Sequence, residues 1–125
     1  MIDNEKLRAA LTLAADFTAT AQAVSDAHAE QRAILQAVRE RIAADKRRAE
    51  ERRTELQGTV ADSSRSATVR SLAQHELDAL AAVSYGPTAE ERAAFDVATR
   101  AGTQAVADLR TAHTALRDAL ADARA

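Results

Sequence analysis

The sequence predicts an all-α fold of long amphipathic helices, and two observations lead to that prediction. The 125 residues include only three glycines and one proline, whereas 33 are alanine, the best helix former. Apolar residues also recur three and four positions apart over long stretches, which is the spacing of a single helix face. Both observations favour long helices joined by few turns.

The first breaker divides the chain near its middle. Asp3 is a good N-cap for a first helix over residues 4–57, and Gly58 is suited to end that helix at its C′ position. A polar turn follows, in which Asp62 or Ser63 would cap a second helix over residues 63–84.

The strongest break is Tyr85-Gly86-Pro87. Thr88 and Glu91 follow it with the spacing of a capping box, which predicts a third helix over residues 89–123. Gly102 lies beside the apolar stripe of this helix, where it costs about 1 kcal/mol of helix propensity. Close approach of another helix would explain it.

Helix lengths favour an elongated antiparallel hairpin, or coiled coil, as a single helical domain over residues 1–125, with its second arm interrupted at Tyr85-Pro87. The first helix would be roughly 80 Å long at 1.5 Å per residue, and the second would cover roughly 30 Å of it. A third helix that reversed at Gly86 would overshoot the tip, whereas one that continued would end near the start of the first. The alternative is a three- or four-helix bundle, in which the first helix breaks near Ser25.

The core of such a hairpin is expected to be thin, because aromatic residues make up only 2% of the chain. Two helices have a poor surface-to-volume ratio and would leave apolar side chains such as Ile34, Val97 and Val106 at the surface. Pairing with a second copy would cover them, so we expect a homodimer, another homo-oligomer, or a helical protein partner. The candidate self-association seam comprises Leu35, Val38, Ile42, Leu109, Leu116 and Leu120.

Residue patterns for catalysis are weak. There is no cysteine and no glycine-rich nucleotide loop. A di-metal carboxylate bundle needs Glu-x-x-His pairs, but His28, His75 and His113 lack a glutamate three residues earlier. His28 falls on the projected seam, where it would set the register or, alternatively, respond to pH. We therefore expect a non-enzymatic structural or adaptor protein with no catalytic, cofactor-binding or metal site.

A basic tip is the alternative site, with nucleic acid or an acidic surface as its partner. Its candidate residues would gather at the Gly58 end of the first helix: Lys46, Arg47, Arg48, Arg52, Arg53, Arg65 and Arg70. Acidic residues interleave with them, since Arg47–Glu51 and Lys46–Glu50 have (i, i+4) spacing, and no aromatic residue is near for base stacking. A solvated helix surface is the favoured interpretation.

Tyr85, the only tyrosine, is a candidate partner anchor, although a structural role at the open end of the core is favoured. No apolar run approaches the ~20 residues of a membrane span, and the acidic, polar start of the sequence is unlike a signal peptide. The bias toward alanine and arginine suggests a bacterial or phage origin. We expect a cytoplasmic or virion-associated protein.

Overall fold

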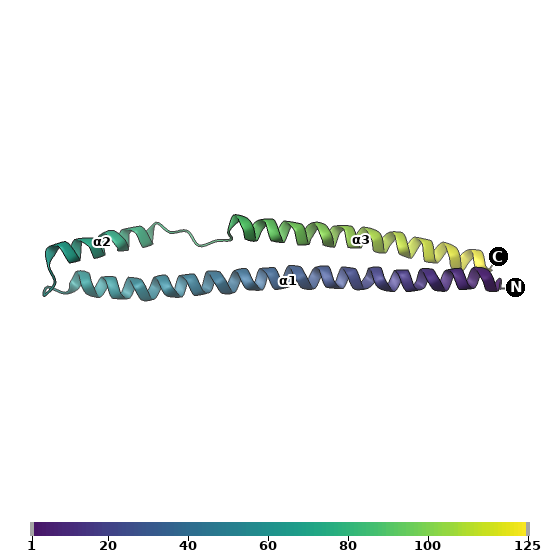
Figure 1. Cartoon of the computed structure of the whole chain (residues 1–125), viewed down its shortest axis with the longest axis horizontal. Helices are drawn as coiled ribbons and strands as arrows, with labels where there is room; N and C mark the ends of the chain where they lie inside the picture. The colour runs from purple at the N-terminus through teal and green to yellow at the C-terminus, as the bar shows by residue number, and fades with distance from the viewer. Residues whose placement is uncertain (1, 125) are drawn as a thin grey trace. The chain divides into compact units, whose positions relative to one another are not determined.

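The computed structural model describes residues 2–124, and within that range the chain forms three α-helices and no strand. The helices are α1 (Asn4–Ala61), α2 (Ala67–Ala81) and α3 (Ala89–Arg124), of 58, 15 and 36 residues (Figure 1). The predicted all-α fold is confirmed.

The chain divides into two compact units. The terminal unit contains residues up to 35 together with those from 89 onward, and the middle unit contains residues 36–88. Helix α1 contributes its first half to the terminal unit and its second half to the middle unit.

Helices α1 and α3 of the terminal unit run antiparallel to each other (Figure 1). The Asp3 amide donates to the Ala123 carbonyl at 3.3 Å, and the rings of Phe17 and His113 lie 6.0 Å apart. Further along, Gln31 Nε2 donates to Thr99 Oγ1 at 3.3 Å. Residue numbers rise on one helix as they fall on the other, which fixes the antiparallel direction within this unit.

Among the described residues of the terminal unit, those that are fully buried are small. They are Ala10, Ala27, Ala98, Gly102, Ala105 and Ala123. At Gly102, an added Cβ would lie 3.6 Å from Gln31 Nε2 and 3.9 Å from Ala27 Cβ, which is ordinary van der Waals contact. The helices therefore approach closely at Gly102, as predicted, but they leave room for a methyl group.

The predicted seam is displaced by one residue along part of α1. Ala27 is buried and Ile34 is half-buried, whereas His28 and Leu35, which were placed on the seam, are exposed. Phe17, Val24 and Gln31 lie seven residues apart and form one row of the seam. The second row of the seam can consist of the residues three positions after them or of those four positions after them. The row after three residues contains Ala27, which permits the closer approach.

The middle unit pairs the second half of α1 with α2. Leu56 of α1 and Ala73 of α2 are its buried apolar residues, with 4% and 5% of their surface exposed. Arg41 Nη2 donates to the Gly86 carbonyl at 2.9 Å. This hydrogen bond fixes the backbone of the segment that follows α2.

The helix ends around the turn of the middle unit differ from those predicted. Helix α1 runs past Gly58 to Ala61, because Gly58 does not adopt a positive φ and continues the helix. Asp62 accepts hydrogen bonds from the Ser64 amide at 3.0 Å and the Ser64 hydroxyl, so it closes the turn instead of capping α2. Ser66 is the N-cap, accepting from the Val69 amide at 3.2 Å.

Other ends agree with the sequence more closely. Asp3 Oδ1 accepts from the amides of Glu5 and Lys6 at 3.0 and 3.2 Å, as expected of an N-cap. Helix α2 ends at Ala81, three residues before the predicted end, and α3 begins at Ala89 as predicted. Helix α1 continues through Ser25 without a break. The single-domain hairpin stays a prediction.

Candidate interaction surfaces

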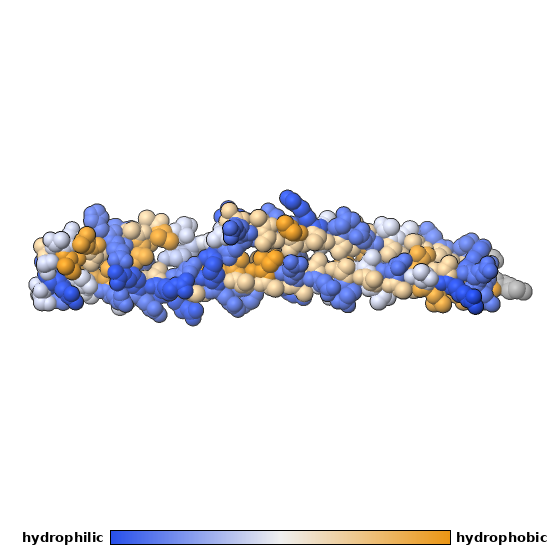
Figure 2. Space-filling view, in the orientation of Figure 1, coloured by the Kyte–Doolittle hydropathy of each residue, from blue (hydrophilic) through white to orange (hydrophobic). Residues whose placement is uncertain are grey.

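Both units carry large apolar side chains on their surface. Leu11 and Val97 in the terminal unit, and Leu72 in the middle unit, each expose more than 60% of their area. Val69 and Val83 are further exposed residues near or on α2. Figure 2 shows apolar residues at the surface among polar ones on the face that it draws.

The residues of the predicted self-association seam belong to both units and differ in exposure. Leu35 and Leu120 expose 39% and 38% of their surface, whereas Val38, Ile42, Leu109 and Leu116 are half-buried. Val38 and Ile42 belong to the middle unit and the other four to the terminal unit. Four of the six are therefore partly covered and keep part of their surface exposed.

Several exposed apolar residues were not singled out from the sequence. Leu11 lies one residue after the buried Ala10, and Leu72 lies one residue before the buried Ala73. Neighbouring residues of a helix are separated by a rotation of about 100°, so an apolar residue next to a buried seam position points away from the interface. This pattern could have identified both residues from the sequence.

The residues of the predicted basic tip are largely paired with carboxylates. Arg53 contacts Glu50 at 2.7 Å, Arg48 contacts Asp45, and Arg65 lies 3.6 Å from Asp62. Glu50, the (i, i+4) neighbour of Lys46, contacts Arg53. The stretch from Asp45 to Asp78 contains seven basic and seven acidic residues, so it has no net charge.

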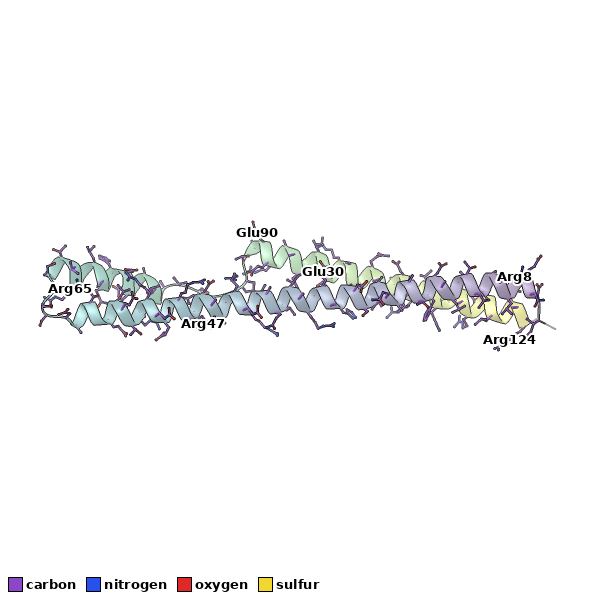
Figure 3. All side chains as sticks on the ribbon, turned by 60° about the horizontal axis from the view of Figure 1, so that its bottom comes forward. Arg8, Glu30, Arg47, Arg65, Glu90 and Arg124 are labelled. Atoms are coloured by element: carbon purple, nitrogen blue, oxygen red, sulfur yellow. The ribbon has the colours of Figure 1, made fainter. Side chains whose placement is uncertain are left out.

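The residues of the predicted basic tip do not all gather at the turn. Figure 3 shows Arg47 along α1, well away from Arg65 in the turn. Arg70 is half-buried, and its Nε has no hydrogen-bond partner within the described residues.

Arg52 makes the one ion pair between α1 and α2 found among the described residues. Its Nε and Nη2 donate to the two carboxylate oxygens of Glu76, each at 2.9 Å, and its Nη1 donates to Glu55. The hydrogen bonds from Arg52 lower the pKa of Glu76, and those to Glu76 and Glu55 raise the pKa of Arg52. This bidentate geometry orients α2 on α1 and engages an arginine of the alternative basic-tip site with carboxylates.

Tyr85 lies in the segment between α2 and α3 and is half-buried. It precedes Gly86, whose carbonyl accepts the hydrogen bond from Arg41. Its role as a partner anchor stays a prediction.

Three shallow grooves follow the helix pairs. The groove of the middle unit, about 230 Å³, is lined by Leu56, Val69, Leu72 and the Arg52–Glu76 pair, among others. The terminal unit has one groove of about 490 Å³ with Asp26, Glu30 and Asp108 at its edges. A second, of about 360 Å³, is lined by residues that include His28, Val106 and Arg110.

Residues 2–124 contain no group of three or more His, Asp or Glu side chains arranged to hold a metal ion. None of the helices described is both long enough and apolar enough to cross a membrane.

Comparison with known proteins gives no further direction: no protein-family model, no curated protein and no solved structure matches this chain.

Proposed function

We propose that this chain is a non-enzymatic structural or adaptor protein that works through helix–helix association, with a second copy as its first partner. The observation that carries the proposal is the placement of its large apolar side chains. Leu56 is the one large hydrophobic residue buried within the described range, while Leu11, Leu72 and Val97 are more than 60% exposed.

The energetic argument follows from that placement. Full burial of a Leu or Val side chain is worth about 1.5–3 kcal/mol, whereas a buried alanine contributes much less. The buried alanines therefore add little, and the exposed Leu and Val side chains leave apolar surface of each helix pair uncovered. Covering several exposed Leu and Val residues together would supply enough to offset the roughly 4–15 kcal/mol that association costs.

The test measures molecular mass and melting temperature as functions of chain concentration. We expect the mass to exceed that of one chain at micromolar concentration and the melting temperature to rise with concentration. Changing Leu35 or Leu11 to Glu should shift assembly to at least tenfold higher concentration. Ala29→Glu, on an exposed position of α1, is the matched control and should leave assembly unchanged.

A monomeric mass at all concentrations up to ~100 µM, or equal effects of Leu35→Glu and Ala29→Glu, would contradict self-association through apolar side chains. The alternative function, binding of nucleic acid through the basic tip, has less support because Arg48, Arg52, Arg53 and Arg65 are paired with carboxylates. A gel-shift assay at ~50 mM salt should show no DNA or RNA complex.

A further inference from the structure

The two flanks of the terminal unit carry opposite charges. Asp26, Glu30 and Asp108 border one groove, and His28 and Arg110 border the other. Ala27 is buried between the helices, and neighbouring residues of a helix are separated by about 100°. Asp26 and His28 therefore lie on opposite sides of the interface between α1 and α3.

The acidic side extends along the whole terminal unit. Residues seven apart keep nearly the same side of a helix, so Asp16 accompanies Glu30, and Asp122 accompanies Asp108. Lys6, in register with Thr20 and Ala27, is the one lysine or arginine at the positions in register with this groove among residues 2–35 and 89–124. The acidic residues at these positions, here called the acidic flank, are Glu5, Asp16, Asp26, Glu30, Glu90, Asp108, Asp118 and Asp122. Figure 3 labels Glu30 in the stretch of α1 that belongs to this unit.

The opposite side has the reverse pattern. Arg117 and Arg124 follow Arg110 at steps of seven residues, and Arg32 lies one turn beyond His28 on α1. We call this set the basic flank: His28, Arg32, Arg92, Arg110, His113, Arg117 and Arg124. Asp96 is the acidic residue in register with it.

The charges around the two grooves are not neutralised inside the unit. Among the described residues, no ion pair joins a cation to Asp26, Glu30 or Asp108, although the side-chain amides of Gln22 and Gln104 donate to the two aspartates at 2.8 Å. Likewise, no carboxylate pairs with Arg110 there. Toward the end of the acidic flank, Lys6 lies 3.5 Å from Asp122, and Arg117 of the basic flank lies 3.5 Å from Asp118.

We propose that the acidic flank of one copy docks against the basic flank of a second copy. Like flanks would repel each other, whereas unlike flanks are complementary in charge. Each also presents apolar area to bury: Val97 lies in register with the acidic flank, and Leu11, Leu35 and Leu120 lie in register with the basic flank.

The available area is sufficient for a stable contact. The α1–α3 pair spans about 50 Å at 1.5 Å per residue, and two adjacent helices are about 20 Å across. One flank therefore offers on the order of 1,000 Å², compared with the roughly 800 Å² per partner of a standard interface. Because the two flanks differ, the contact is heterologous, and each added copy leaves one flank open for another. Assembly then continues beyond a dimer.

The test uses the full chain and deepens the self-association proposed above, on which it rests. Sedimentation velocity should show species larger than two chains at ~50 mM salt and at least a tenfold weaker association at ~500 mM salt. Reversing the acidic flank (Glu30→Arg with Asp108→Arg) or the basic flank (Arg32→Glu with Arg110→Glu) should each abolish assembly. An equimolar mixture of the two variants should restore it, since each retains one native flank.

Arg100→Glu is the matched control, because it reverses an exposed charge on the side of α3 away from both flanks. It should leave assembly intact, and circular dichroism should show full helicity in every variant. Assembly that neither flank reversal alters would overturn the flank proposal while leaving self-association standing, whereas a monomeric native chain would overturn both. A mixture that fails to reassemble, or an Arg100→Glu effect equal to that of the basic-flank reversal, would also overturn the flank proposal.

Discussion

The terminal and middle units solve the same packing problem with different side chains. In the terminal unit, the residues fully buried within the described range are alanines and Gly102, spread along more than thirty residues of each helix. The middle unit has a much shorter partner helix, α2, and relies on Leu56, Ala73 and the bidentate Arg52–Glu76 pair. A long interface can be built from many weak contacts, whereas a short one needs a few strong ones.

Because of this difference, we expect single substitutions to change the free energy of unfolding by different amounts in the two units. In the terminal unit each buried methyl group contributes little, so the stabilisation is spread over many positions. In the middle unit, Leu56 is the one large apolar side chain among the described residues that is fully buried. The largest single-residue effects on unfolding are therefore expected in the middle unit.

The largest expected effect comes from Leu56→Ala. Removing this buried side chain should lower the free energy of unfolding of the middle unit by about 2–3 kcal/mol, because the surrounding residues cannot fully close the space. Hydrogen exchange of the α2 amides, followed at a fixed chain concentration, measures it. Leu72→Ala, at a site 63% exposed on the same helix pair, is the control and should change the rates little. Equal effects of the two substitutions would contradict the concentrated core of the middle unit.

An intermediate effect, of the opposite sign, is expected for Gly58→Ala. Gly58 lies inside α1 and is exposed, and an added Cβ would meet no atom within 4 Å. Alanine should therefore raise the free energy of unfolding by up to about 1 kcal/mol through helix propensity. Thermal unfolding followed by circular dichroism measures the gain, and a loss of stability would show that the glycine is needed where it stands.

Gly102→Ala provides the corresponding measurement in the terminal unit. The added Cβ would make ordinary contacts with Gln31 and Ala27, so we expect a gain no larger than that of Gly58→Ala. If Gly102→Ala instead lowers the melting temperature, the α1–α3 interface tolerates no added atom.

The smallest expected effect is a dependence of the middle unit on pH. Arg52 lowers the pKa of Glu76, so the folded state favours the ionised carboxylate. That stabilisation is present above the ordinary carboxyl pKa and is lost as the pH falls below about 4 and Glu76 becomes protonated. Since both side chains are close to half exposed, the effect on stability is small.

Glu76→Gln should flatten this dependence in hydrogen-exchange rates of α2 measured between pH 6 and roughly pH 3. Asp78→Asn is the control on the same helix, because Asp78 accepts only the amide of Gln74 among the described residues. If the pH profile of Glu76→Gln equals that of the native chain, the Arg52–Glu76 ion pair does not stabilise the middle unit.

Much of the secondary structure could be predicted because its causes are local. Asp3 caps α1 as expected, and Pro87 precedes the predicted start of α3 at Ala89. The Gly58 prediction was wrong because glycine ends a helix only where the chain turns, and no local signal forces a turn at that residue. The N-cap of α2 is Ser66 and not Asp62, because the Asp62 carboxylate accepts hydrogen bonds from Ser64 in the turn.

The candidate interaction surfaces were harder to predict from the sequence than the helices. The basic residues of the predicted tip are evident in a linear reading, but their pairing with Asp45, Glu50, Asp62 and Glu76 depends on rotamers and on a helix 24 residues further along the chain. The charge sorting of the terminal unit was overlooked because it becomes visible only after the buried line is known.

The sequence by itself determined that this chain is helical and where its breaks lie, because capping, helix propensity and the scarcity of glycine and proline act over a few residues. Only the tertiary structure decided which line of each helix is buried. Ala27 and His28 both satisfy the helical spacing, and one residue of difference rotates the helix by about 100°. That rotation turns His28 outward and separates the acidic from the basic flank, so the surface of this protein follows from the packing of its smallest side chains.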